Sequence, residues 1–411
     1  MHRRAFFRAA PGALAAASAR AQAPPLKSQH KIKRIRYFAS PGDAAQRQTK
    51  VPQQFNQSAN LVLIDTESGL TGIGEGGSKD TIEQCAAAII GLDAFRTEQI
   101  WQLLFRGYFY PAGREKLHAI GALDMALWDL KAKALGVPLY QLFGGLARDH
   151  IECYSTGYPS RGSLRETAAA CVADGYRAFR ISAADGTPYD RFESVPRTYE
   201  NCKQVREGVA KDGAWAIDFH TRLDLPDAVR LANLIQDLGP YFVEDLVRSE
   251  NPGVHKTVRP LVKVPIAVGE QFGARWDLNE LVENRLIDYA RVTVPNVGGI
   301  TEFLKIAAIC ETHYVGLIPH FTGPASEAAL VHLCAAFSGP VLMEMLPRVA
   351  AKPIAYLEQC FDFRNGKLWP NNRPGIGVEF TPSKLTQISE ITGYAQPIPT
   401  FRRPDGSVTN W

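Results

Sequence analysis

The chain has 411 residues, of which 45% are hydrophobic, so it is long enough to bury one large core and a second, smaller one. Its net charge of +4 comes from 46 basic and 42 acidic residues without a long basic block, a pattern that gives no support for binding nucleic acid. This composition excludes a disordered chain and favours two packed domains.

Residues 1–23 predict a cleavable export signal. Arg3 and Arg4 precede an Ala-rich, weakly apolar run that ends in Ala21-Gln22-Ala23, a pattern that resembles a twin-arginine signal. The run is too short for a membrane anchor, so we expect a periplasmic protein without membrane contact after cleavage. The protein stays cytoplasmic if the signal is not functional.

Residues 31–148 predict an α+β capping domain. The stretches "KIKRIRYFAS" and "ANLVLIDTESGLTGIGEGG" alternate apolar and polar residues before Gly-rich turns, which indicates antiparallel strands. The polar stretch 41–58 between them predicts a long loop. From Thr81 to Leu146 the pattern is helical, with Ala122, Met125, Ala126 and Asp129 on one face.

Residues 149–360 predict a barrel. Eight short apolar runs alternate with amphipathic stretches, and parallel strands need such crossover helices. The runs are "ECYST", "AFRIS", "AWAIDFH", "YFVEDL", "PIAVGEQ", "DYARVTV", "YVGLIPH" and "PVLMEML". The alternative is an open doubly wound sheet, but its GxGxxG turn is absent. Residues 361–411 are predicted to return to the capping domain.

Three acidic residues follow successive predicted strands. Asp218, Glu244 and Glu270 are spaced 26 residues apart, the length of one strand-helix unit, so neighbouring strands bring them to one rim. Clustered carboxylates repel one another unless a hard cation lies between them, and oxygen ligands suit Mg²⁺. We therefore predict a magnesium site. The alternative is that each acid caps a helix or pairs with an arginine.

Two histidines and a further acid are expected at the same rim. His220 follows Asp218 by two residues, and His320 ends the seventh strand. Glu344 ends the eighth strand with the same geometry, either as a contact for the substrate or as a structural partner.

These residues carry a resemblance. "GALDMALWDLKAKALGVPLYQLFGG", the three spaced acids, "VGGIT" and "IPH" resemble the mandelate racemase branch of the enolase superfamily. The resemblance implies a capping domain over a modified (β/α)₇β barrel, with Mg²⁺ held by Asp218, Glu244 and Glu270. It also implies removal of the proton α to a carboxylate as the first chemical step.

The second strand departs from the racemases of this branch. They carry Lys-x-Lys where this chain has Arg180 and Ser182, and neither replacement is a good base. Members with a His-Asp dyad carry Asp where this chain has Thr293, so His320 lacks its usual orienting carboxylate. Both departures resemble D-mannonate dehydratases, in which a Tyr assisted by the strand-two Arg is the base. Tyr189 is the candidate here.

The stretch "DFHTRL" resembles acid-sugar dehydratases in general, where the His after the first metal ligand protonates the leaving hydroxyl. The leading hypothesis is a Mg²⁺-dependent dehydratase of a sugar acid, with His220 as the acid and His320 or Tyr189 as the base. Arg180, Ser182, Arg222 and Glu344 are candidates for binding the substrate. A racemase or a catalytically weak sugar-acid binder are the alternatives, and the family implies a homo-oligomer, either a dimer or an octamer.

Overall fold

The computed structural model describes residues 29–42, 44, 58–110, 112–183, 191–320, 323–347, 354–358, 361–395 and 400–409. The predicted signal, residues 1–23, and Tyr189 lie outside this part of the chain. Among the described residues, no helix combines the length and the apolar character that crossing a membrane requires.

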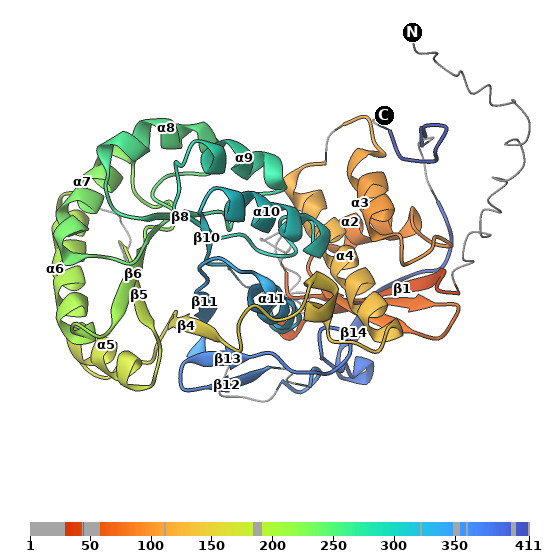
Figure 1. The fold of residues 1–411 in the computed structure, drawn as a ribbon, viewed down its shortest axis with the longest axis horizontal. Helices are drawn as coiled ribbons and strands as arrows, with labels where there is room; N and C mark the ends of the chain where they lie inside the picture. The colour runs from red at the N-terminus through yellow and green to blue at the C-terminus, as the bar shows by residue number, and fades with distance from the viewer. Residues whose placement is uncertain are drawn as a thin grey trace, which may run out of the picture.

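The N-terminal capping domain, or cap, packs helices on a four-stranded antiparallel sheet, at the right in Figure 1. The sheet order is β14-β1-β2-β3, with β2 buried along its whole length. Gly74 lets the sheet approach helix α4 closely, because a Cβ there would lie 1.9 Å from the carbonyl oxygen of Ala122. The elements are β1 (Ile32–Ala39), β2 (Leu61–Thr66), β3 (Thr71–Glu75), α2 (Lys79–Ala87), α3 (Thr97–Arg106), α4 (Arg114–Ala134) and β14 (Thr386–Ile391).

All eight strands predicted for the barrel are present. Strands β4 to β10 pair in sequence order as parallel neighbours, and β11 pairs with β4. The last two strands are joined by a single parallel bridge between Leu317 and Val341. The strands are β4 (Ile151–Ser155), β5 (Ala178–Ser182), β6 (Ala214–Asp218), β7 (Val243–Glu244), β8 (Ile266–Val268), β9 (Tyr289–Ala290), β10 (Gly316–Leu317) and β11 (Met343–Met345).

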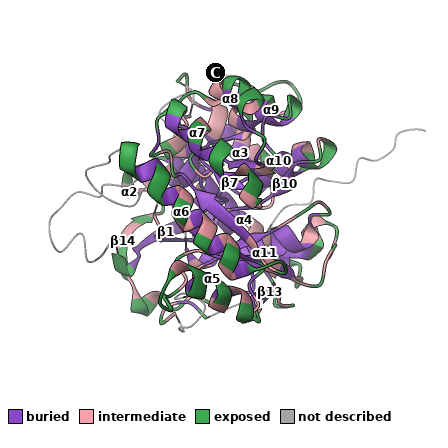
Figure 2. Cartoon of the chain, turned by 90° about the vertical axis from the view of Figure 1, so that its left-hand side faces the viewer, coloured by how far each residue is buried: buried purple, intermediate pink, exposed green. Residues whose placement is uncertain are grey.

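Helices alternate with these strands and cover the outside of the barrel, at the left in Figure 1. Figure 2 shows the buried strands inside and the exposed edges of the helices outside. This arrangement confirms the predicted modified (β/α)₇β barrel with an α+β cap. The helices are α5 (Leu164–Ala173), α6 (Arg191–Val209), α7 (Leu225–Ile235), α8 (His255–Val258), α9 (Arg275–Glu283), α10 (Ile300–Thr312) and α11 (Pro324–Ala336), with short 3₁₀ turns at η1 (Leu139–Phe143), η2 (Gln236–Leu238), η3 (Pro252–Val254), η4 (Arg259–Leu261) and η5 (Pro382–Lys384).

The C-terminal segment contacts both domains. The hairpin of β12 (Asp362–Arg364) and β13 (Lys367–Trp369) pairs antiparallel with the start of β4. The chain then reaches the cap, where β14 pairs antiparallel with β1.

Buried carboxylates join the cap to the barrel and the C-terminal segment. Asp124 of α4 accepts hydrogen bonds from the backbone N–H and the hydroxyl of Thr301, at 2.8 and 2.6 Å, in the first turn of α10. Glu75, which ends β3, accepts from the N–H of Ala325 and the hydroxyl of Ser326 at the start of α11, at 2.8 and 3.1 Å. Both acids satisfy donors that a helix N-terminus leaves without intrahelical partners.

A third acid and a glycine complete this region, which we call the seam. Asp129 of α4 accepts from the backbone N–H of Ile73 at 2.9 Å and of Ile376 at 2.8 Å. Gly299 has φ +98°, and a Cβ there would lie 2.4 Å from Oδ2 of Asp124. The helix α10 can therefore approach the cap only because residue 299 has no side chain.

Candidate functional site

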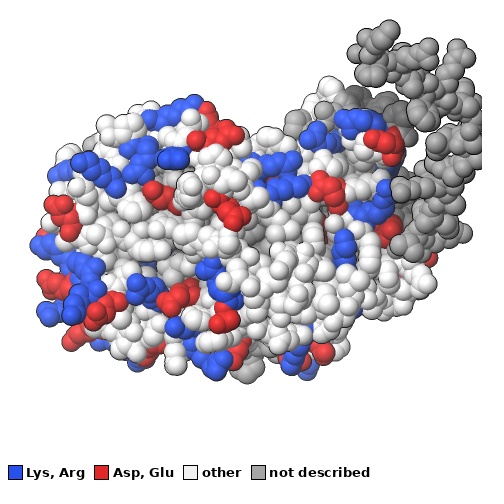
Figure 3. All heavy atoms as spheres, in the orientation of Figure 1, with Lys and Arg blue, Asp and Glu red and all other residues white. Residues whose placement is uncertain are grey.

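The predicted acids lie at the carboxyl ends of neighbouring barrel strands. We call this end of the barrel the mouth. Asp218 ends β6, Glu244 ends β7 beside it in register, and Glu270 follows β8 by two residues. Asp218 and Glu244 are buried, and the Glu270 side chain is 13% exposed. On the face shown in Figure 3, acidic and basic side chains are mixed. The mouth therefore gathers buried negative charge.

Arg180 of β5 binds two of the predicted metal ligands. Its Nη1 lies 2.6 Å from Oδ2 of Asp218 and 3.0 Å from Oε2 of Glu244. Its Nη2 lies 3.9 Å from Oε1 of Glu344. Although burial disfavours its charge, Glu244, Glu344 and Asp218 raise the pKa of Arg180 above its ordinary value. The cation in this apolar strand is thus a counter-ion for the acids at the mouth.

A second arginine, Arg291, follows β9 and is fully buried. Its Nε donates to Oε1 of Glu244, and its Nη2 donates to Oε2 of Glu344 at 2.6 Å. Its Nη1 donates to the hydroxyl of Tyr154 at 2.5 Å. Both oxygens of Glu244 are therefore hydrogen-bonded to guanidinium groups, one to each arginine.

Asp245, which was not predicted, belongs to the same cluster. One oxygen from each of Glu244, Asp245 and Glu270 lies within 4.8 Å of the other two. Asp245 is 5% exposed, and its Oδ2 has no hydrogen-bond partner among the residues that the structure describes. Burial, followed by the charges of Glu270 and Asp218, raises its pKa well above the ordinary value. This carboxylate is therefore ionised only at a free-energy cost unless a cation lies nearby.

The charge balance fits a divalent cation. Five carboxylates meet two guanidinium groups at the mouth within the described part of the chain, an excess of three negative charges when all are ionised. Burial and then Asp218 raise the pKa of Glu244 well above its usual range, despite the nearby Arg291. Oxygen-only donors suit Mg²⁺. The residues present therefore fit the ion that the fold family implies.

The two predicted histidines face one carboxylate from two sides. His220 Nε2 lies 3.7 Å from Oε1 of Glu270, and His320 Nε2 lies 3.6 Å from Oε2 of the same residue. Thr293 Oγ1 lies 3.2 Å from His320 Nδ1. Burial lowers the pKa of His320, although Glu270 and Glu344 act to raise it, which favours the neutral ring.

The remaining predicted residues surround this cluster. Ser182 ends β5 in register with Asp218. Arg222 is exposed and donates to the carbonyl oxygen of Ala183 at 3.3 Å. Glu344 pairs with the two arginines, and Arg291 and Arg180 lower its pKa although burial acts to raise it. Their contacts with a substrate stay predictions.

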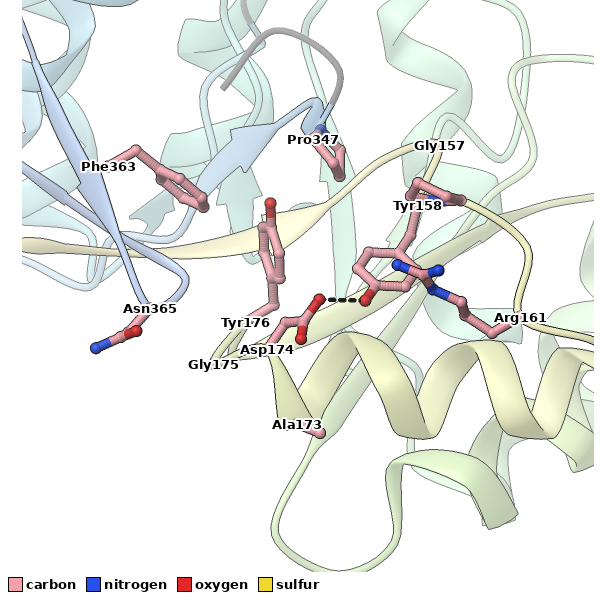
Figure 4. Close-up of a pocket in the computed structure, with 11 residues that line it drawn as sticks. Gly157, Tyr158, Arg161, Ala173, Asp174, Gly175, Tyr176, Pro347, Phe363 and Asn365 are labelled. Carbon is pink, nitrogen blue, oxygen red and sulfur yellow. Dashed lines mark hydrogen bonds between the residues drawn. The ribbon is translucent and has the colours of Figure 1, made fainter. Parts of the chain in front are cut away.

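A large hollow lies elsewhere on the surface. It measures about 640 Å³ and is formed by the loop after β4, the end of α5 and the turn of the β12–β13 hairpin. Figure 4 shows its aromatic rings and the hydrogen bond that Tyr158 donates to Asp174. None of the predicted site residues that the structure describes lines it. We place the candidate site at the mouth because the titratable groups converge there. The size of a hollow alone does not indicate where titratable groups meet.

Local backbone geometry explains why Asp245 was not predicted at the mouth. Adjacent residues of a strand point to opposite faces, so Glu244 and Asp245 were not expected together. Asp245 has φ +45°, a left-handed conformation that ends the alternation. His220 has φ +50° and also lies beyond the end of its strand. The two adjacent acids in "VED" were the available signal.

Comparison with known proteins adds to this geometry. The model of the mandelate racemase / muconate lactonizing enzyme N-terminal domain matches residues 42–144, and that of the enolase C-terminal domain-like family matches residues 163–384. A D-mannonate dehydratase from Caulobacter vibrioides is 30% identical over 85% of this chain and 94% of its own. A D-galactonate dehydratase from Pectobacterium atrosepticum is 32% identical over 85% of this chain and 96% of its own. The crystal structure of an enolase superfamily member from Salmonella Typhimurium is 25% identical and covers 88% of this chain and 99% of its own, with a TM-score of 0.77.

Proposed function

The chain belongs to the mandelate racemase / muconate lactonizing enzyme family of the enolase superfamily and is a hydro-lyase, and on this premise we propose that it converts a sugar acid into a 2-keto-3-deoxy acid. The observation that carries the proposal is the pair of imidazoles on either side of Glu270. Dehydration needs one group that removes a proton and a second that protonates the leaving hydroxyl, and two histidines at one carboxylate can supply both.

A divalent cation, with Mg²⁺ as the proposed ion, would be held by Glu244, Glu270 and a third carboxylate at the mouth. When bound, it would stabilise the negative charge that develops on the substrate carboxylate as the α-proton leaves. The excess of negative charge among the buried acids supports this assignment.

In the proposed reaction, His320 removes the proton from the carbon next to the substrate carboxylate, which leaves an enediolate. Its lowered pKa keeps the ring neutral and able to accept a proton. Thr293 would hold the ring through the 3.2 Å contact with Nδ1. Tyr189 is the alternative base and lies outside the described residues.

His220 would then protonate the hydroxyl on the neighbouring carbon, which departs as water. The resulting enol loses the proton of its hydroxyl group at C2, takes up a proton at that neighbouring carbon, and so becomes the 2-keto acid. The side chain of His220 is 47% exposed, so it can exchange protons with solvent between turnovers.

The test is an assay of hexonates and pentonates for 2-keto acid, with Mg²⁺ and after its removal with EDTA. We expect turnover of at least one acid that stops with EDTA and returns with Mg²⁺. A metal-loaded protein that dehydrates none of these acids would overturn the proposal.

Deuterium exchange separates the two histidines. In D₂O, H220N should still exchange the α-proton of the substrate while it loses dehydration, because only the second step is blocked. H320N should lose both. If H320N retains exchange and Y189F loses it, Tyr189 is the base and His320 is not.

A further inference from the structure

The hollow beside α5 contains a buried tyrosine whose hydroxyl the protein itself does not bind. Tyr176 follows α5, is 5% exposed and lines the hollow. Its hydroxyl points into the hollow (Figure 4) and has no hydrogen-bond partner among the residues that the structure describes. Burial raises the pKa of Tyr176, so the hydroxyl keeps its proton and can donate. A hydroxyl removed from water without a partner is costly, and a ligand in the hollow would supply the partner.

Two glycines fix the floor of the hollow. Gly175 has φ +92°, and a Cβ there would lie 2.5 Å from the carbonyl oxygen of Asn365. Gly366 has φ +69°, and a Cβ there would lie 2.1 Å from the carbonyl oxygen of Gly175. The turn after α5 and the turn of the β12–β13 hairpin therefore touch backbone to backbone. This contact brings Tyr176 beside Phe363, so the hollow is built by packed elements of the fold.

The aromatic walls of the hollow meet at steep angles. The ring centroids of Tyr158 and Tyr176 are 6.1 Å apart with 83° between the ring planes. Those of Tyr176 and Phe363 are 5.5 Å apart with 41° between the planes. A planar ligand cannot stack on two neighbouring walls that are inclined in this way. The walls suit a ring that is not flat, such as the chair of a pyranose sugar, whose C–H groups pack on aromatic faces.

Polar groups of both kinds surround these rings. Asp174 accepts a hydrogen bond from the hydroxyl of Tyr158. Burial and then Asp174 raise the pKa of Tyr158, and Arg161 acts to lower it, so the acid and the guanidinium both lie beside this hydroxyl. Asn365 adds an exposed amide. Arg161 and Asp174 are the charged residues among the described lining residues, and their charges cancel. The hollow therefore suits a neutral ligand rich in hydroxyl groups, each of which both donates and accepts.

We propose that the hollow is a carbohydrate-binding site, in which a neutral pyranose packs on the aromatic walls and bonds through its hydroxyls to Tyr176, Asp174 and Asn365. Its volume of about 640 Å³ is typical of small-molecule sites, which measure about 300–1,000 Å³. None of the described acids and histidines of the mouth lines it. The site is therefore separate from the proposed reaction and does not depend on it.

The experiment uses the methyl pyranosides of D-glucose, D-galactose and D-mannose, and maltose, with phenylacetate as a planar aromatic comparison. Saturation-transfer difference NMR measures their binding to the full chain in the presence of Mg²⁺. These sugars have no carboxylate, so they lack the group on which the proposed reaction acts. We expect saturable binding of at least one of them. If no sugar binds saturably, or if phenylacetate binds more tightly than every sugar, the proposal is overturned.

Two variants with matched controls test the contacts. Y176F removes the hydroxyl and keeps the buried ring, so we expect the affinity for the best sugar to fall about fivefold, the effect of one hydrogen bond. D174N removes a charged acceptor, and we expect a loss of about tenfold. Y314F and D237N change an exposed tyrosine and an exposed acid that do not line the hollow, and they should leave the affinity unchanged. An affinity that Y176F or D174N leaves unchanged would overturn the proposed contacts.

A diffraction experiment covers the case in which a variant does not fold. In crystals of the unchanged protein soaked in the best sugar, the density of a pyranose should lie against Phe363 and within hydrogen-bond reach of the Tyr176 hydroxyl. A sugar found only at the mouth would overturn the proposal. Dehydration of sugar acids by Y176F should equal that of the unchanged protein, so a failure of the carbohydrate site and a failure of the proposed function are measured separately.

Discussion

Buried carboxylates occur in two regions of this molecule, and their oxygens have different kinds of partner in the two. At the seam, Glu75, Asp124 and Asp129 accept hydrogen bonds from backbone N–H groups of other elements. At the mouth, the acids lie beside one another and share two guanidinium groups, and one oxygen of Asp245 has no partner in the described part of the chain.

The difference indicates what each region does. An acid whose oxygens are all met by N–H and hydroxyl donors holds elements together and has little capacity left for a ligand. Acids that crowd together raise one another's pKa and need a further cation, which is how binding sites are built. Variants should therefore separate the two regions: those at the mouth should lose activity and stay folded, and those at the seam should lose stability and stay active.

The largest effect is expected from E270Q. Glu270 is the carboxylate that both histidines face, and it is one of the proposed metal ligands. We expect kcat for the best sugar acid to fall about 10³-fold. A thermal melt is the control, and a chain that no longer folds would contradict the separation of the two regions.

Asp124 tests the seam through pH. Burial raises its pKa from an ordinary 3.8 to about 7, so between about pH 4 and 7 the folded chain keeps a proton that the unfolded chain has released. The free energy of unfolding should therefore fall as pH rises through this window, by about 4 kcal/mol in total.

The side chain of residue 124 does not titrate in D124N. The melting temperature of D124N minus that of the unchanged protein should therefore rise between pH 5 and pH 8. A constant difference across that range would show that Asp124 does not hold the proton. Activity at 25 °C should be close to normal in both proteins.

E75A should destabilise the contact between cap and barrel. It removes the acceptor of the Ala325 N–H and the Ser326 hydroxyl, which are buried. We expect a loss of about 2 kcal/mol in the free energy of unfolding, measured by urea titration and circular dichroism. E75Q keeps one acceptor oxygen and should lose less, and equal losses would contradict the hydrogen-bond explanation.

The smallest effect is expected from W101F. Trp101 Nε1 donates to the carbonyl oxygen of Gly298 at 2.8 Å across the same seam. Phe keeps most of the packing and leaves that carbonyl without its donor, so about 1 kcal/mol should be lost with no change in KM. A change in KM would show that the seam also shapes the mouth.

The fold was predictable because its signals are local. Each barrel strand is an apolar run followed by an amphipathic stretch, and the 26-residue spacing of three acids fixes the repeat. The strand lengths were not predictable. Strands β7, β9 and β10 have two residues each, fewer than the apolar runs from which these strands were predicted. Pairing between strands sets these lengths, and a single run does not contain that information.

The position of a candidate residue was predictable where one residue type at a strand end was enough, as for Glu244, Glu270 and the histidines. Asp245 required a backbone conformation that strand alternation does not predict. Predicting the partners of Arg180 would have required the register of the strands that carry them. At the seam, Asp129 was expected on the apolar face of its helix, but its partners Ile73 and Ile376 come from distant parts of the chain.

The pairing of β1 with β14 has a consequence for biosynthesis. Ile35 pairs with Ile391, so the second residue of this contact is translated 356 positions after the first. The edge of β1 that β14 covers has no strand partner until residue 391 has left the ribosome, and long-range pairing of this kind is slow. During that interval β1 presents unpaired backbone groups to other chains, so binding by a chaperone would be most useful at this strand.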